Sequence, residues 1–213
     1  QKIPRRIFKM DLQMDRFTET EDRFKACVQR AHAICGIQEY LAKNHTSALD
    51  SSDLLRASIV LCVSAFDFLI HELVRIETLE CYRTKRDISR LHIPFLFGIV
   101  SEEDRESLLE QHVKRTNSYR SFVDPGKFAE AIGSFVDHPW QQVADKLSKP
   151  PAELKARVRT IYQWRNRIAH EADINPVYSG IELWPIETSD VTDAVNDIAR
   201  VGVATIAILR DNT

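Results

Sequence analysis

The chain has 213 residues, a mass of 24.5 kDa and a formal net charge of −2, with 44% hydrophobic and 28% charged residues. This composition is typical of one soluble globular domain with a substantial core. The small negative charge argues against non-specific coating of nucleic acid, which needs a strongly basic domain, although it permits a local basic cleft.

The hydrophobic spacing in the first half of the chain is helical. Apolar residues recur at three- and four-residue steps over 12–44, which predicts a long amphipathic helix. After a polar break at 45–53, the segment 54–82 is apolar on more than one face, as expected of a helix in the middle of a bundle. A shorter helix, interrupted at Pro94, is expected over 84–100.

The second half of the chain is also predicted to be helical, and several residues mark where the helices begin and end. Ser101 precedes a run of acidic residues, Pro176 follows the end of a periodic segment, and Thr188 or Ser189 is the expected N-cap of the last helix. The expected elements are helices over 101–116, 124–136, 140–147, 149–173 and 188–210, and a short extended return over 180–187.

These elements predict a single all-α domain over 1–213, built as a bundle of about five to seven helices. No internal repeat or linker divides the chain, and no apolar run approaches the roughly 18 residues expected of a membrane span. The cysteines are spread without a CxxC pair, so reduced thiols and a cytoplasmic protein without membrane association are expected. They are Cys27, Cys35, Cys62 and Cys81.

The stretch YQWRNRIAHEADINP (162–176) concentrates reactive side chains at the end of a helix. Asn166 and His170 are four residues apart and share a helical face, so the amide is expected to orient the imidazole. Arg167 flanks the histidine and is expected to add to the wall of a cleft. Arg165 is five residues before His170 and therefore about 140° away around the helix.

Such residues suit the cleavage of RNA by its own 2′-hydroxyl group. His170 would move a proton to or from an attacking or leaving oxygen, a role worth about 10²–10⁴ in rate. Arg165 would bind the phosphate and stabilise its charge in the transition state, worth about 10²–10³. This chemistry needs no metal or cofactor, and DNA is inert because it lacks the 2′-hydroxyl.

The spacing of Arg165 and His170 is not informative alone. A histidine five, six or seven positions after an arginine occurs three times in the chain, and chance predicts roughly two occurrences. The pair Arg105 and His112 belongs to a charged amphipathic face. The pair Arg86 and His92 surrounds Asp87, an alternative partner for the arginine.

The context of Arg165 and His170 matches a known family. RNRIAHEAD (165–173) resembles the Arg-x4–6-His signature of HEPN domains, in which a polar residue follows the arginine. DLLRASIVLCVSAFDFLIHELV (53–74) is similar to the long early helix of the RiboL-PSP-HEPN branch, and LWPIETSDVTDAVNDIARVGVAT (183–205) to its closing segment. The resemblance covers a core from about residue 50 to residue 213. The N-terminal helix within 1–45 and a helical insertion around 84–148 match less well.

The resemblance implies a helical domain that dimerises, so that two Arg/His motifs face each other across one composite cleft. It implies Arg165 as the signature arginine, Asn166 as the polar residue after it and His170 as the catalytic histidine. Asp67 and His71 match an acidic residue and a following histidine in the early helix, and are expected to line the cleft.

The implied activity is that of a metal-independent endoribonuclease that leaves a 2′,3′-cyclic phosphate and a 5′-hydroxyl. The implied substrates are tRNA or single-stranded RNA. The implied setting is antiviral defence or a toxin–antitoxin pair, with an antitoxin or another regulatory partner.

Structural alternatives remain open for each of these residues. The structural alternative for His170 is that the helix macrodipole favours a histidine in the last turn of a helix. Asp67 and His71 also suit a buried polar pair that bridges helices. The His71–Glu72 and His170–Glu171 steps raise the alternative of a metal site, although no HExxH motif is present.

Two further features have both a functional and a structural interpretation. Tyr162 and Trp164 would stack on a base or pack in the core. The basic stretch 81–90 would follow an RNA backbone or form a solvated helix end. For the whole chain, the rival to a nuclease is a non-catalytic domain that binds RNA or nucleotide, or that dimerises within a larger system.

Overall fold

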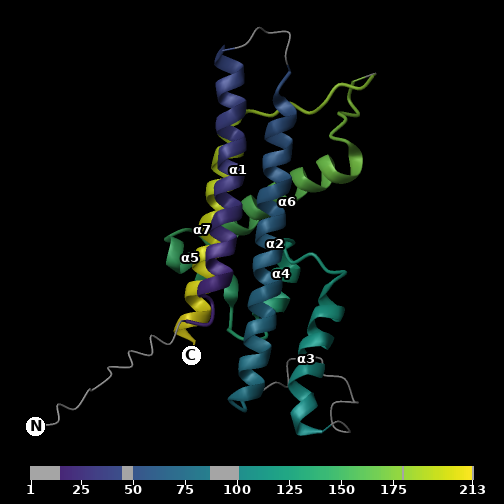
Figure 1. Ribbon diagram of the computed structural model, residues 1–213. Coiled ribbons are helices and arrows are strands. Elements are labelled where there is room, and N and C mark those ends of the chain that lie inside the picture. Colours follow the sequence, from purple (N-terminus) through teal and green to yellow (C-terminus); the bar gives the residue numbers. More distant parts are fainter. Residues whose placement is uncertain (1–14, 45–49, 87–100, 179, 213) are drawn as a thin grey trace, which may run out of the picture.

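Three long helices form the frame of the molecule: α1 (Thr18–Asn44), α2 (Ser52–Arg83) and α7 (Thr188–Asp211) (Figure 1). The computed structural model describes residues 15–44, 50–86, 101–178 and 180–212. Between α2 and α7 the chain forms α3 (Glu102–Asn117), α4 (Pro125–Ile132), α5 (Pro139–Leu147) and α6 (Pro151–Glu171). The prediction of an all-α bundle of five to seven helices is confirmed for the described residues.

Helix α2 lies at the centre of the bundle and packs against α1, α7, α6, α3 and α4. This position follows from its sequence, because a helix that is apolar on several faces must be covered on several faces. Contrary to the expectation from the sequence, α2 also has the length and hydropathy of a membrane span. However, 56% of that apolar window is buried inside the bundle, as in the core helix of a soluble protein.

Helix α7 approaches α1 closely at Gly202. A Cβ atom at this position would lie 2.4 Å from Cε1 of Phe24 and 3.0 Å from a methyl carbon of Leu69. Both distances are shorter than ordinary van der Waals contact, so any larger side chain would push the two helices apart.

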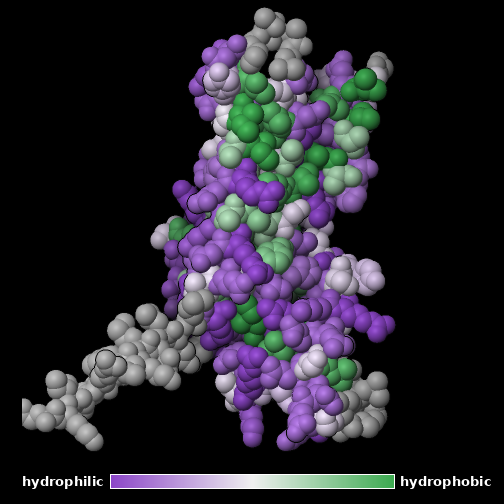
Figure 2. Space-filling model, in the orientation of Figure 1, coloured by the Kyte–Doolittle hydropathy of each residue, from purple (hydrophilic) through white to green (hydrophobic). Residues whose placement is uncertain are grey.

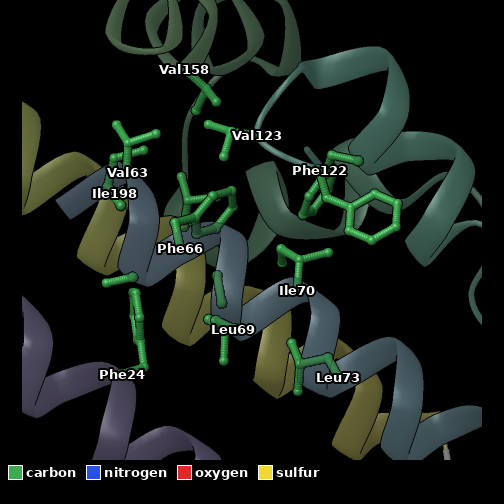
Figure 3. Close-up of a cluster of buried hydrophobic side chains, with 14 of the residues drawn as sticks. Phe24, Val63, Phe66, Leu69, Ile70, Leu73, Phe122, Val123, Val158 and Ile198 are labelled. Atoms are coloured by element: carbon green, nitrogen blue, oxygen red, sulfur yellow. The ribbon is translucent and has the colours of Figure 1, made fainter. Parts of the chain in front are cut away.

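The core surrounds the middle of α2, between α1, α6 and α7. Figure 3 shows side chains from distant parts of the chain converging on the middle of α2. Phe24 of α1 is 1% exposed, and its core partners are at most 3% exposed. These partners are Val63, Phe66, Leu69, Ile70 and Leu73 of α2, Phe122 and Val123 between α3 and α4, Val158 of α6, and Ile198 of α7.

The predicted elements and the observed ones differ mainly at their ends. The N-cap of α7 is Glu187 rather than Thr188 or Ser189, and it makes no side-chain capping bond. The Thr188 hydroxyl instead donates to Oε1 of Gln38 at 2.7 Å, because α1 lies beside the start of α7. The extended return is confirmed as an antiparallel bridge between Ile174 and Leu183.

Some predicted segments lie outside the described residues. These are the first three residues of the helix expected over 12–44, most of the break at 45–53, and nearly all of the interrupted helix expected over 84–100.

Candidate functional site at the end of helix α6

Helix α6 ends in two consecutive residues with left-handed backbone conformation. Ala172 has φ 51° and Asp173 has φ 55°. The backbone N–H groups of both residues donate to the carbonyl oxygen of Arg167, which closes the last turn of the helix. The chain therefore turns back towards α2 directly after the Arg/His motif.

The Asp173 carboxylate is buried between two arginines. It is 1% exposed, and its Oδ2 accepts a hydrogen bond from Nε of Arg56 at 2.7 Å. Its Oδ1 accepts from Nε of Arg167 at 2.5 Å. Two such partners offset the cost of removing the carboxylate from water, and the loss of the carboxylate would take this partner from the buried Arg56 guanidinium.

Trp184 joins this network from the extended return. Its backbone oxygen accepts from the Arg56 guanidinium at 2.8 Å, and its backbone N–H donates to the Asp173 carbonyl at 3.0 Å. The Arg167 guanidinium lies over the indole ring, 4.7 Å from its centre. The last turn of α6 is therefore tied to both the first turns of α2 and the extended return.

Arg167 has partners that the sequence did not identify. Its side chain turns to Asp173 and Trp184 and makes no hydrogen bond with His170 within the described part of the chain, and its place in the wall of a cleft stays a prediction. The guanidinium pairs with this carboxylate because hydrogen bonds between two charged groups are strong where water is excluded. The structure supports a positioning role for Arg167.

Arg165 and Asn166 contact each other. The Arg165 guanidinium donates to Oδ1 of Asn166 at 3.0 Å, and both side chains are half-buried. The expected hydrogen bond from Asn166 to His170 does not form between these described residues. The amide oxygen of Asn166 is instead used to hold the arginine.

His170 lies on the outer side of the same turn. It is exposed, and its imidazole makes no hydrogen bond or ion pair with any residue that the structure describes. Since α6 is continuous from Pro151 to Glu171, the five-residue step directs Arg165 and His170 to different sides of the helix. One chain therefore offers an open imidazole and, separately, a half-buried arginine.

Asp67 and His71 fasten the segment between α3 and α4 to the middle of α2. Oδ1 of Asp67 accepts from the backbone N–H of Phe122 at 2.6 Å. Nε2 of His71 lies 3.0 Å from the carbonyl oxygen of Arg120, and the ring packs on Phe122 with centroids 4.6 Å apart. A carbonyl only accepts, so this nitrogen carries the proton. The pair has these structural contacts, and its place in a cleft stays a prediction.

A hollow of about 550 Å³ lies between α2 and the end of α6. Its walls are mainly apolar, and the buried network forms its floor at Arg56 and Asp173. The apolar lining residues are Ala57, Val60, Leu61, Ile168, Ala172 and Leu183. Sequence reasoning missed Arg56 and Trp184. The signal for Arg56 was a lone arginine in an apolar run, which needs a partner that sequence alone does not identify.

Two alternative interpretations are now supported. Tyr162 and Trp164 are half-buried and pack against the core, and Arg157 lies over the indole of Trp164. In the basic stretch 81–90, Arg83 pairs with Glu106 and Arg86 with Glu77. A packed aromatic pair and a salt-bridged helix end therefore fit these two features. Among the described residues, no three His, Cys, Asp or Glu side chains gather closely enough to hold a metal ion.

Comparison with known proteins supports one assignment. The family model described as RiboL-PSP-HEPN matches residues 35–209, from the middle of α1 almost to the end of α7. No match was found among curated proteins or among solved structures. The matched region contains the whole Arg/His motif and the network that supports it. The chain therefore belongs to the RiboL-PSP-HEPN family, and its helical bundle is a HEPN domain.

Proposed function

We propose that the protein is a metal-independent endoribonuclease in which His170 is the acid–base group. The observation that carries this proposal is the contrast within one helical turn. His170 is exposed and unpaired among the described residues, whereas the turn that carries it is held by buried ion pairs. A reactive group on a rigid support is what a catalytic site needs. The HEPN family also generally includes RNase-type effectors.

The reaction is an internal transfer at phosphorus. A base removes the proton of the 2′-hydroxyl, and the 2′-oxygen forms a bond to phosphorus while the bond to the 5′-oxygen breaks. The departing 5′-oxygen takes a proton. His170 carries out one of these proton transfers, and Arg165 binds the phosphate oxygens as their charge increases. The products are a 2′,3′-cyclic phosphate and a 5′-hydroxyl.

The composite cleft requires two copies of the chain. Because Arg165 and His170 point to different sides of α6, the arginine of one protomer and the histidine of its partner would act on the same phosphate. An exposed apolar patch beside the motif supports this arrangement. Val177 is 78% exposed, Tyr178 is 52% exposed and Ile181 is 85% exposed. Figure 2 shows hydrophobic surface over this end of the molecule, and such patches mark protein contacts.

The central experiment is cleavage of total tRNA and of a mixed single-stranded RNA in EDTA. Wild type and His170→Ala are compared, with His32→Ala as the matched control because α1 does not contact α6. We expect wild type and the control to cut and leave cyclic phosphate ends, and His170→Ala to lose at least about 10²-fold in rate. Equal cutting by His170→Ala would exclude this histidine.

If neither wild type nor the control cuts RNA, the nuclease proposal is wrong. The RNA-binding or dimerisation module is then the better description.

The composite cleft has its own test, in which inactive subunits complement each other. Arg165→Ala and His170→Ala are each expected to be inactive, and mixing them should restore cleavage. A mixed dimer would pair the intact arginine of one protomer with the intact histidine of the other. Light scattering should show a dimer that Ile181→Asp dissociates. A monomeric active enzyme would contradict the shared site.

The biological setting that we propose rests on the resemblance to the family. A ribonuclease that needs no cofactor must be restrained, so an antitoxin or another regulatory partner is expected. A cytoplasmic role in defence or growth arrest fits such an enzyme. Expression of wild type should stop growth, and His170→Ala should not.

A further inference from the structure

The outer face of α6 carries a line of polar side chains that leads to His170. Lys155, Arg159, Gln163, Asn166 and His170 follow one another at steps of four, four, three and four residues. Such steps place them on one stripe of the helix. All are exposed except Asn166, which is half-buried. The stripe is turned away from the buried face formed by Leu154, Val158 and Ile161.

Both cations of the stripe are available to a ligand. Neither Lys155 nor Arg159 forms a hydrogen bond or an ion pair with the residues that the structure describes. Arg157, between them in sequence, is used differently, because its Nε donates to Asp197 of α7 at 2.8 Å. Arg157, which is paired with α7, therefore lies in sequence between two cations that are exposed to solvent.

The acidic residues of α6 itself lie off the stripe. Glu153 lines a separate hollow with Asp190, Asp193 and Asp197 of α7. In helical position it is about 160° from Lys155, and Glu171 also falls off the stripe. Lys149, Arg157 and Arg200 line the same hollow, so the side facing α7 has mixed charge, whereas the charged side chains of the stripe before His170 are both cations.

The dimensions suit a nucleic-acid strand. Each step of four residues advances about 6 Å along the helix, and Lys155 is about 22 Å from His170. Steps of this size are comparable to the separation of neighbouring phosphates in an extended single strand. The stripe therefore spans about three to four nucleotides.

A surface hollow lies at the far end of the stripe. It has a volume of about 660 Å³ and includes Lys155, His138, Gln141 and Pro151 in its lining. His138 and Gln141 are exposed, and a hollow of this size has room for a nucleoside. Asp137 also lines the hollow, and its charge makes a base or ribose a better occupant than a phosphate.

We propose that this stripe is an RNA-backbone track. Lys155 and Arg159 bind phosphates three to four nucleotides from the cleaved bond, and the hollow beside Lys155 receives the nucleoside at the end of the track. The proposal rests on the proposed function for the position of the cleaved bond. It specifies the substrate as single-stranded RNA with several nucleotides on one side of the cut.

The test compares substrates that reach the track with substrates that do not. A single-stranded 12-mer RNA covers the stripe, whereas the dinucleotide UpA occupies only the cleavage site. In Lys155→Gln/Arg159→Gln, kcat/KM for the 12-mer should fall about 25-fold at 0.1 M salt, the value for two lost phosphate contacts on a single strand. Cleavage of UpA should be unchanged. Equal losses on both substrates would overturn the track.

The control removes the same charge elsewhere. Arg30→Gln/Arg115→Gln replaces exposed cations on α1 and α3, two helices without contacts to α6 in the described structure. This variant should cleave the 12-mer like wild type. An equal loss in the control would mean that only net charge matters and would overturn the track.

A measurement of RNA affinity shows whether the proposed track or the proposed nuclease activity is wrong. In a His170→Ala background, the affinity for the 12-mer should depend on salt, and Lys155→Gln/Arg159→Gln should reduce the log–log slope by about 1.4. This result would support the track even if wild type cleaves nothing. An unchanged slope, or no binding of the 12-mer, would overturn it.

Discussion

The two sides of the last turn of α6 differ in what their charges do. On the inner side, Arg167 and Asp173 are held with Arg56 in a buried network. On the outer side, His170 is exposed and has no partner among the described residues. Arg167 and His170 are only three positions apart in a motif that the sequence presents as one functional unit. Membership of a motif therefore does not assign a role, and the contacts of each side chain must be known.

The largest expected effect on stability is on the inner side. Asp173→Ala leaves two guanidinium groups without their carboxylate, one of them buried, and should lower the free energy of unfolding by about 3–5 kcal/mol. His170→Ala should change it by less than about 0.5 kcal/mol, because the side chain is exposed and unpaired. Denaturant unfolding measures both. Similar losses in the two variants would remove the distinction between the two sides.

Arg167 tests whether the inner side acts only by positioning. Arg167→Ala removes a charged hydrogen bond and the contact with the Trp184 ring, and should cost about 2 kcal/mol. Arg167→Lys should recover part of the stability, since a lysine still pairs with Asp173.

The rate of RNA cleavage at saturating substrate provides the second readout for Arg167. It should recover with stability in Arg167→Lys. A lysine variant that is stable but inactive would show that the guanidinium touches the substrate.

Substitution of Asp67, which lies outside the Arg/His motif, should have a smaller effect on stability. Asp67→Ala removes the acceptor for the Phe122 N–H group and should cost about 1–2 kcal/mol. Asp67→Asn keeps an oxygen acceptor and should be close to wild type in both stability and cleavage. If the asparagine variant is stable and loses cleavage, the carboxylate has a chemical role that its contacts with the loop do not explain.

The smallest expected effect is on the reactivity of the cysteine thiols, which also depends on whether a group is buried or exposed. Burial raises the pKa of the Cys62 thiol to about 12 and also raises the pKa of Cys81. The thiolate is the reactive form, so both should resist alkylation in the folded protein at pH 8. Cys27 is half-buried and should react first. Mass spectrometry of iodoacetamide-treated protein identifies the labelled positions, and early labelling of Cys62 would contradict the packing of α2.

Local signals were sufficient to predict most of the helices. The start of α4 follows from Asp124 and Pro125, because the carboxylate accepts from two free N–H groups and proline fits the first turn. The end of α6 shortly before Pro176 follows from local rules as well. These signals act over a few residues and do not depend on the rest of the fold.

The partners of the polar residues were not predictable, because they are distant in sequence. Asp173 pairs with a residue 117 positions earlier, and the Thr188 hydroxyl with one 150 positions earlier. A pattern of residues indicates that Arg56 needs a partner, but several carboxylates would satisfy that need. Only the packing of α6 across α2 determines which one does.

The shared carboxylate has a consequence for how this chain can change over time. Arg56 lies far from Arg167 and Asp173 in the sequence, yet the substitution of one of the three alters the charge balance of the others. Relatives with a neutral residue at position 173 should therefore also lack the arginine at position 56. The three positions should vary together, whereas Lys155 and Arg159 are free to vary one at a time.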